Sequence, residues 1–182
     1  DKFNVPNPAS ILNDEVLNFT ISDGATESYK SKLWASLLCN ELNEFSVSKT
    51  NILELITSLS KKWYESIDIE KIPWYAIPKF EKGAHATFLN LKVNLNQNLL
   101  TYFAIGDSCF FHIRENNLLN WMPVKNSITF NSNPELISSN PQANSKLLEY
   151  LNEGEINLLA NDFIIVCTDA IAQWFLSNCE KN

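Results

Sequence analysis

Three apolar runs that each end in an acidic tripeptide constrain this chain more than any other feature of its sequence. The tripeptides are Ser22-Asp23-Gly24, Gly106-Asp107-Ser108 and Thr168-Asp169-Ala170. Aspartate is among the least favourable residues in a buried strand, so each tripeptide is predicted to mark the end of one. Carboxylates gathered at one rim of a sheet repel each other, and the usual remedy is a metal ion or a shared proton.

The composition narrows the class of protein. The chain has 182 residues, of which 45% are hydrophobic, and this is enough for one domain with a sizeable core. The formal net charge of −7 and the single arginine, Arg114, argue against a nucleic-acid surface. No apolar run is long enough for a membrane span and no secretory signal is visible. We therefore expect a cytoplasmic protein that binds neither nucleic acid nor membranes.

The four cysteines do not have the spacing of a metal site. They are far apart in the chain and none forms a Cys-x-x-Cys pair, so neither a zinc site nor a disulfide framework is expected. Cys109 and Cys167 lie in apolar runs and are predicted to be small buried side chains.

The apolar pattern changes along the chain from helical to strand-like spacing. Strands are expected near Phe3 and Val5 and over residues 16–22, 85–93, 99–105, 110–114, 118–124 and 163–168. Helices are expected over residues 27–42, 51–66, 147–151 and 170–178. Irregular segments are expected over residues 67–83 and 126–145. Helices followed by a meander of strands predict an α+β domain with an antiparallel sheet, because the strict alternation of a parallel sheet is missing.

Asp23-Gly24 illustrates how one of the tripeptides could bind a cation. The glycine allows a sharp turn, and its carbonyl oxygen can face the same point as the Asp23 carboxylate, which suits magnesium or manganese. Each tripeptide taken alone is also explained without a ligand. Asp23-Gly24 could be a turn or a helix cap, Gly106-Asp107-Ser108 a hairpin turn, and Asp169 the cap of the following helix.

Taken in order, the tripeptides resemble those of the metal-dependent protein phosphatase 2C family, and of its bacterial members above all. The matching segments are Phe19-Thr20-Ile21-Ser22-Asp23-Gly24-Ala25-Thr26-Glu27-Ser28, Lys82-Gly83-Ala84-His85-Ala86-Thr87, Ala104-Ile105-Gly106-Asp107-Ser108-Cys109 and Cys167-Thr168-Asp169-Ala170. The resemblance covers nearly the whole chain. It implies that residues 1–182 form a single phosphatase 2C-like domain, truncated at one or both ends.

The resemblance implies an α+β fold, namely an α-β-β-α sandwich of two antiparallel sheets flanked by helices. It also implies a centre of two magnesium or manganese ions at one end of the sandwich. Asp23 would bridge the two ions, Gly24 would give its carbonyl oxygen to one, and Asp169 would bind the other. Asp107 would lie near the centre and act through water. Asp1 falls where the family has an acid on its first strand.

The activity implied by the resemblance is hydrolysis of phosphoserine or phosphothreonine in a protein substrate, a reaction of signal transduction. Metal-bound water has a lowered pKa and can attack the phosphorus in line, while the ions offset charge on the phosphoryl oxygens. No covalent phospho-enzyme is needed. We expect a monomer whose partner is the phosphoprotein substrate.

Four departures from the family pattern keep other hypotheses open. Ala25 stands where many members have a histidine that acts as general acid, and Ala170 where the third motif usually has glycine. An arginine before the first acid and a late aspartate beyond the third motif are both missing. The chain could therefore be a catalytically inactive phosphatase-like domain that binds a phosphoprotein or a regulatory partner. An unrelated sheet-rich binding domain with chance matches is the third hypothesis.

The remaining polar and aromatic candidates have plainer interpretations. His85 and His112 could each be a general acid, although a packed or surface role is favoured for both. Arg114 is most simply a solvated charge. The stretch 74–78 could line a substrate cleft, but packing is the preferred interpretation for its aromatic residues, as it is for the tryptophans at helical spacing.

Overall fold

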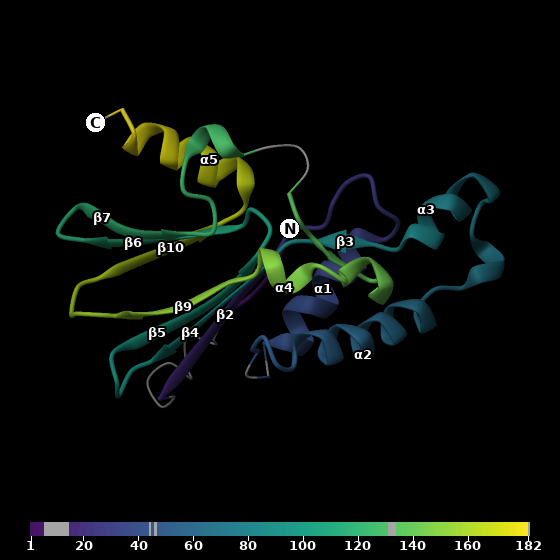
Figure 1. Ribbon diagram of the computed structural model, residues 1–182, viewed down its shortest axis with the longest axis horizontal. Coiled ribbons are helices and arrows are strands. Elements are labelled where there is room, and N and C mark those ends of the chain that lie inside the picture. Colours follow the sequence, from purple (N-terminus) through teal and green to yellow (C-terminus); the bar gives the residue numbers. More distant parts are fainter. Residues whose placement is uncertain (6–14, 44, 46, 131–133, 182) are drawn as a thin grey trace.

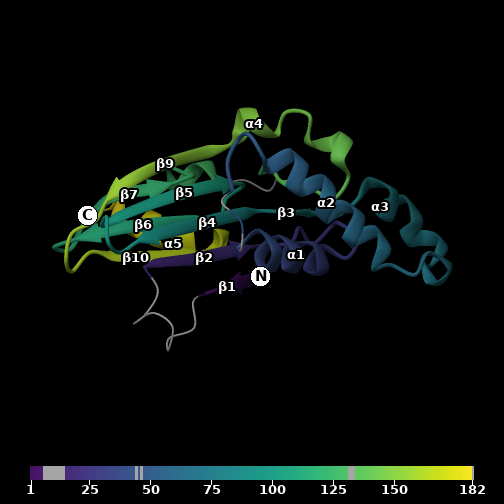
Figure 2. The same cartoon turned by 90° about the horizontal axis from the view of Figure 1, so that it is seen from below.

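Two antiparallel sheets stack face to face, with helices on the outer face of each (Figure 1). The structure, a computed structural model, describes residues 1–5, 15–43, 45, 47–130 and 134–181. The layers are those of the α-β-β-α sandwich, so the predicted fold class is confirmed. In Figure 2 the strands lie toward the left and α2 and α3 toward the right, so this helical segment projects past the ends of the sheets.

The larger sheet has the strand order β1-β2-β4-β5-β9, and every neighbouring pair is antiparallel. Its strands are β1 (Lys2–Asn4), β2 (Val16–Ser22), β4 (Phe88–Asn94), β5 (Leu99–Ile105) and β9 (Asn152–Asn157). Ile21 pairs with Leu89, so the end of β2 lies beside the start of β4. This register brings Asp23 next to the residues that precede β4.

The smaller sheet has the order β10-β6-β7 and is also antiparallel. Its strands are β6 (Cys109–Arg114), β7 (Asn117–Met122) and β10 (Phe163–Cys167), and a separate two-stranded ladder joins β3 (His85–Ala86) to β8 (Ile137–Ser138). Cys167 pairs with Cys109, so the chain leaves β10 beside the point where it enters β6. The second and third acidic tripeptides therefore meet at one end of this sheet.

Alternating strand residues separate the layers. In β4, Phe88 packs with the helices of the larger sheet, whereas Leu89 faces the smaller sheet. In β6, Phe110 faces the larger sheet, whereas Phe111 packs on the other side against the helix Asp169–Cys179. The period of two along a strand thus supplies two apolar faces, which each sheet needs when it is covered on both sides.

The helices follow the predicted apolar stripes. They are α1 (Ser31–Leu42), α2 (Ile52–Glu65), α3 (Ile77–Lys82), α4 (Leu147–Tyr150) and α5 (Asp169–Cys179). Trp34 and Trp63 are fully buried where α1 and α2 meet the larger sheet, as the helical spacing of the tryptophans indicated. The same interpretation is wrong for Trp174 of α5, which is 65% exposed. Among the described residues, no helix combines the length and the apolar character needed to cross a bilayer.

Four segments differ from the sequence-based expectation. The segment 126–145, predicted to be irregular, contains strand β8 and two 3₁₀ turns. The run 85–93, expected to be one strand, is divided at Thr87 into β3 and β4, which belong to different sheets. Strand β9 was not predicted, because its sequence is hydrophilic and contains a glycine. The segment 67–83, predicted to be irregular, contains two 3₁₀ turns and the helix α3.

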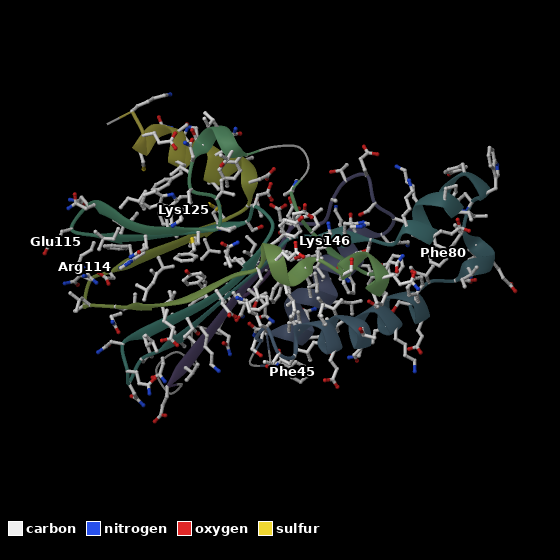
Figure 3. All side chains as sticks on the ribbon, in the orientation of Figure 1. Phe45, Phe80, Arg114, Glu115, Lys125 and Lys146 are labelled. Atoms are coloured by element: carbon white, nitrogen blue, oxygen red, sulfur yellow. The ribbon has the colours of Figure 1, made fainter. Side chains whose placement is uncertain are left out.

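A buried ion cluster joins the two sheets at the end labelled by Arg114 in Figure 3. The Asp162 carboxylate, whose side chain is 3% exposed, accepts hydrogen bonds from Arg114 Nε at 2.7 Å and Nη2 at 2.8 Å. His112 Nε2 lies 2.9 Å from the same carboxylate, and Arg114 also donates to the Asn157 carbonyl of β9. The interpretation of Arg114 as a solvated charge is therefore wrong, since the guanidinium is fixed by a carboxylate that it partly buries.

Candidate metal centre

Asp23 is positioned by its backbone rather than by its side chain. The Asp23 N–H donates to Thr87 Oγ1 at 2.8 Å, and the Asp23 carbonyl accepts from the Thr87 N–H at 2.9 Å. The Ser22 hydroxyl donates to the Thr87 carbonyl at 2.5 Å. These bonds hold the end of β2 against the break between β3 and β4, and they leave the Asp23 carboxylate free to face outward.

Thr87 also fixes the second acidic tripeptide. Its hydroxyl shares a 2.7 Å hydrogen bond with the buried hydroxyl of Ser108. Its methyl group lies where Gly106 would carry a side chain, since a Cβ there would be 2.7 Å from Thr87 Cγ2. Gly106 also has φ +97°, a conformation that L residues rarely adopt. One threonine therefore determines how both Asp23 and Asp107 enter the site.

Asp169 and Asp1 come from the third strand end and from the start of the chain. Asp169 is the first residue of α5, where the helix N-terminus favours a negative charge. The preceding Thr168 donates its hydroxyl to Asp1 Oδ2 at 3.3 Å, and the Asp1 amino group lies 3.4 Å from Asp23 Oδ1. The Asp1 residue thus lies between the first and the third acidic tripeptide.

The three aspartates line one cavity of about 680 Å³. Gly24, Glu27 and Ser28 line the same cavity, as do the cations Lys79 and Lys82 and the imidazole of His85. Its lining residues are Asp23, Gly24, Ala25, Thr26, Glu27, Ser28, Lys79, Lys82, Gly83, His85, Thr87, Asp107, Pro134, Leu136 and Asp169. The expectation that carboxylates from three strand ends gather at one rim therefore agrees with the geometry.

The electrostatics of Asp107 reflect this gathering. Burial, together with the negative charges of Asp169 and Asp23, raises the pKa of its carboxyl to about 6. A carboxyl whose neighbours disfavour its ionised form is relieved by a bound cation or by a proton. Hard oxygen donors of this kind suit magnesium or manganese, and magnesium commonly keeps several waters and only one or two carboxylates.

The donor set fits such an ion, although it is not a closed cage. Within the described part of the chain, no three acidic, histidine or cysteine side chains lie close enough together to hold one ion. Carboxylates completed by water and by a backbone carbonyl, such as that of Gly24, match the coordination habit of magnesium. The candidate ligands therefore remain Asp1, Asp23, Gly24 and Asp169, with Asp107 beside them.

Replacing Asp107 by asparagine should stabilise the metal-free protein at neutral pH. Because folding raises the pKa of this carboxyl from an ordinary 3.8 to about 6, its ionisation above pH 6 opposes folding, and this cost is absent below about pH 4. We expect the thermal midpoint of Asp107→Asn in EDTA to rise by roughly 2–4 °C at pH 7.5. The difference should vanish at pH 4. An unchanged or lower midpoint at pH 7.5 would contradict the argument.

The two histidines have different surroundings. His112 is fully buried between Asp162 and Asn120 Nδ2, which is 3.1 Å from its Nδ1, so the packed interpretation applies to it. His85 is half-buried in the cavity wall, and burial lowers the pKa of its imidazole below 6.5, which leaves it uncharged at neutral pH. The neutral ring keeps one N–H donor and one lone pair.

The packing interpretation of the stretch 74–78 is wrong for its aromatic residues. Trp74 and Tyr75 are 83% and 68% exposed, and their rings contact each other with centroids 6.0 Å apart. The neighbouring Phe80 is the aromatic residue that packs, against Trp63, Tyr64 and Tyr29.

The cysteines have the predicted character. All four are free thiols, and Cys109 and Cys167 are buried beneath α5. Burial raises the pKa of the Cys109 thiol to about 12 and that of Cys167 to about 11, so both stay protonated. Neither is suited to nucleophilic attack on phosphorus.

No family model and no curated protein sequence matches this chain, but solved structures do. A bacterial serine phosphatase superposes with a TM-score of 0.59 and 12% identity, over 97% of this chain and 81% of that one. The photosystem II phosphatase PBCP gives 0.58 and 13%, over 99% and 72%. The chain has the fold of the protein phosphatase 2C family. The catalytic domain of PstP in complex with two manganese ions also shares this phosphatase 2C fold, with a TM-score of 0.53 and 10% identity over 94% of this chain and 72% of that one.

Sequence reasoning missed three residues of this phosphatase 2C-like cavity. Thr87 was recognised only as the end of a matching segment, because its role depends on contacts with Asp23 and Ser108 that are distant in sequence. Lys82 was recognised only as the start of the same segment, and Lys79 lay in a segment predicted to be irregular. Their i, i+3 spacing on either side of Phe80 could have indicated a short helix with a cationic face.

Proposed function

We propose that this chain is a metal-dependent protein phosphatase that hydrolyses phosphoserine or phosphothreonine with water at a centre of two magnesium or manganese ions. The convergence of Asp23, Asp107 and Asp169 in one cavity carries the proposal. When bound, such ions supply an activated water and compensate charge on the phosphoryl group. The phosphatase 2C fold and a manganese-bound protein that shares it support the same assignment.

In this proposal each residue has a defined task. The Asp23 and Asp169 carboxylates and the Gly24 carbonyl hold the ions, and Asp1 completes the set from the first strand. Asp107 lies beside them in the same cavity and would act on the ions through water. Pro134 and Leu136 contribute apolar surface to the cavity wall.

A direct assay tests the proposal. Purified protein should release phosphate from a phosphothreonine peptide and from para-nitrophenyl phosphate when manganese is present. The manganese concentration should be on the order of millimolar, because an open set of hard oxygen ligands binds the ion weakly. EDTA should abolish the release, and re-added manganese should restore it. A folded protein that binds manganese in calorimetry but leaves both substrates intact would contradict the catalytic assignment.

The open ligand set favours a second candidate function. Because the described residues include no closed group of three metal-binding side chains, and Ala25 replaces a potential acid, the domain could bind a phosphoprotein or a regulatory partner without turnover. Calorimetry separates the two candidates. Absence of manganese binding together with retained binding of the phosphothreonine peptide would favour the binding domain.

A further inference from the structure

The cavity is lined by two cations as well as by its carboxylates. Lys79 and Lys82 both line it from α3, three residues apart and therefore on one face of the helix. Arg114, the only arginine of the chain, is occupied by Asp162 at the other end of the sheets. Among the described residues that line the cavity, these two lysines are therefore the side chains with a permanent positive charge.

The helix that carries the lysines is firmly anchored. Phe80, between them, stacks on Trp63 with centroids 5.8 Å apart and meets Tyr29 edge-on at 5.8 Å. The helix ends at Gly83, where φ is +84° and an added Cβ would lie 2.9 Å from Ser139 Oγ. With its middle and its end both fixed, α3 holds the bases of both lysine side chains at defined places on the cavity wall.

The two lysines differ in what they already bind. Lys79 Nζ lies 3.2 Å from Glu27 Oε2, a carboxylate that is 92% exposed. Within the described part of the chain, no carboxylate lies within ion-pairing distance of Lys82. The Lys82 ammonium group can therefore bind an external anion directly. The Lys79 ammonium group can do so once its weak surface ion pair with Glu27 breaks.

A phosphate group needs such cations here. Without bound metal ions, the carboxylates of Asp23, Asp107, Asp169 and Glu27 in the cavity walls create a negative field that opposes entry of a dianion. A lysine ammonium offers three donors to phosphate oxygens and offsets part of that field. We infer that Lys82, assisted by Lys79, forms the subsite that binds the phosphoryl group of the substrate and the phosphate product. This inference rests on the proposed function for its substrate, but phosphate binding can be measured without turnover.

Calorimetry with inorganic phosphate tests the subsite, with and without manganese. We expect Lys82→Ala to weaken phosphate binding roughly tenfold and the double variant Lys79→Ala/Lys82→Ala to weaken it more. Lys82→Arg should retain binding. Lys71→Ala is the matched control, because Lys71 lies in the same α2–α3 segment, is 83% exposed and pairs with Asp68 outside the cavity. If turnover occurs, KM for para-nitrophenyl phosphate should rise in Lys82→Ala while kcat changes little.

A variant that binds phosphate more tightly than the wild type provides a second test, because misfolding would weaken phosphate binding rather than strengthen it. Glu27→Gln removes the partner of Lys79 and one negative charge from the wall, so phosphate should bind about two- to threefold more tightly. Wild-type protein that binds phosphate without hydrolysing any substrate would support the subsite while the phosphatase proposal fails. Wild-type protein that is active, with phosphate affinity and KM unchanged in the double variant, would overturn the subsite while the phosphatase proposal stands. No phosphate binding by the wild type would also overturn it.

Discussion

Asp23→Asn should reduce manganese-dependent hydrolysis of a phosphothreonine peptide by about 10³-fold, because loss of about 4 kcal/mol of charge stabilisation in the transition state has that effect on rate. The carboxylate proposed to bridge two ions loses one of its charged oxygens, while its shape is kept. The decline should appear in kcat at saturating manganese, and manganese affinity in calorimetry should fall with it.

The fold should tolerate this substitution, which makes the result interpretable. The Asp23 backbone keeps both hydrogen bonds to Thr87, and its side chain is one-third exposed and paired only with the amino group of Asp1 among the ion pairs of the described residues. Loss of an exposed pair costs little, so the thermal midpoint in EDTA should change by no more than about 2 °C. Asp68→Asn removes an exposed carboxylate paired with Lys71 and should leave activity intact. Full activity of Asp23→Asn would refute the assignment of Asp23.

Asp162→Ala should lower the thermal midpoint by roughly 5–10 °C without involving the cavity. The substitution leaves Arg114 and His112 without their shared carboxylate and removes an acceptor for the Leu159 N–H. The loss is large because the partners stay behind in a buried cluster. Asp68→Ala, which breaks an exposed pair, should change the midpoint by no more than about 2 °C.

The pH dependence of this loss has a definite sign. The Arg114 guanidinium holds the pKa of the Asp162 carboxyl well below its usual range. A carboxyl with a depressed folded-state pKa stabilises the protein above its unfolded pKa near 4, and this contribution is lost as pH falls through the folded value. The midpoints of wild type and Asp162→Ala should therefore differ most at neutral pH and converge in strong acid. A constant difference across that range would show that the carboxylate charge is not responsible.

The sequence was most informative where short-range pattern decides structure. The apolar runs before Asp23, Asp107 and Asp169 were placed correctly as β2, β5 and β10, because short runs rich in β-branched and aromatic residues favour strands. The order of the three tripeptides also anticipated that their carboxylates share one cavity. The metal ligands themselves stay predictions.

Contacts between residues far apart in the sequence determine the structural features that the sequence pattern did not predict. Strand β9 is polar and exists because β5 pairs with it; its Gly154 leaves room for the Tyr102 hydroxyl, which would lie 2.6 Å from an added Cβ. The break at Thr87 comes from bonds to Asp23, 64 positions away. Arg114 was misjudged because its partner, Asp162, lies in a different part of the sequence.

The two ends of the β-sandwich differ in how their charged side chains are neutralised. At one end Asp162 and Arg114 supply permanent ions of both signs, and the apolar layer between the sheets needs no ligand to form. At the other end Asp23, Asp107 and Asp169 share the cavity with Lys79 and Lys82, and bound metal ions would neutralise the remaining negative charge. Under the proposed function, folding and activation would be separate events. The newly made protein would be folded but inactive, and the supply of manganese or magnesium would determine which fraction of it is active.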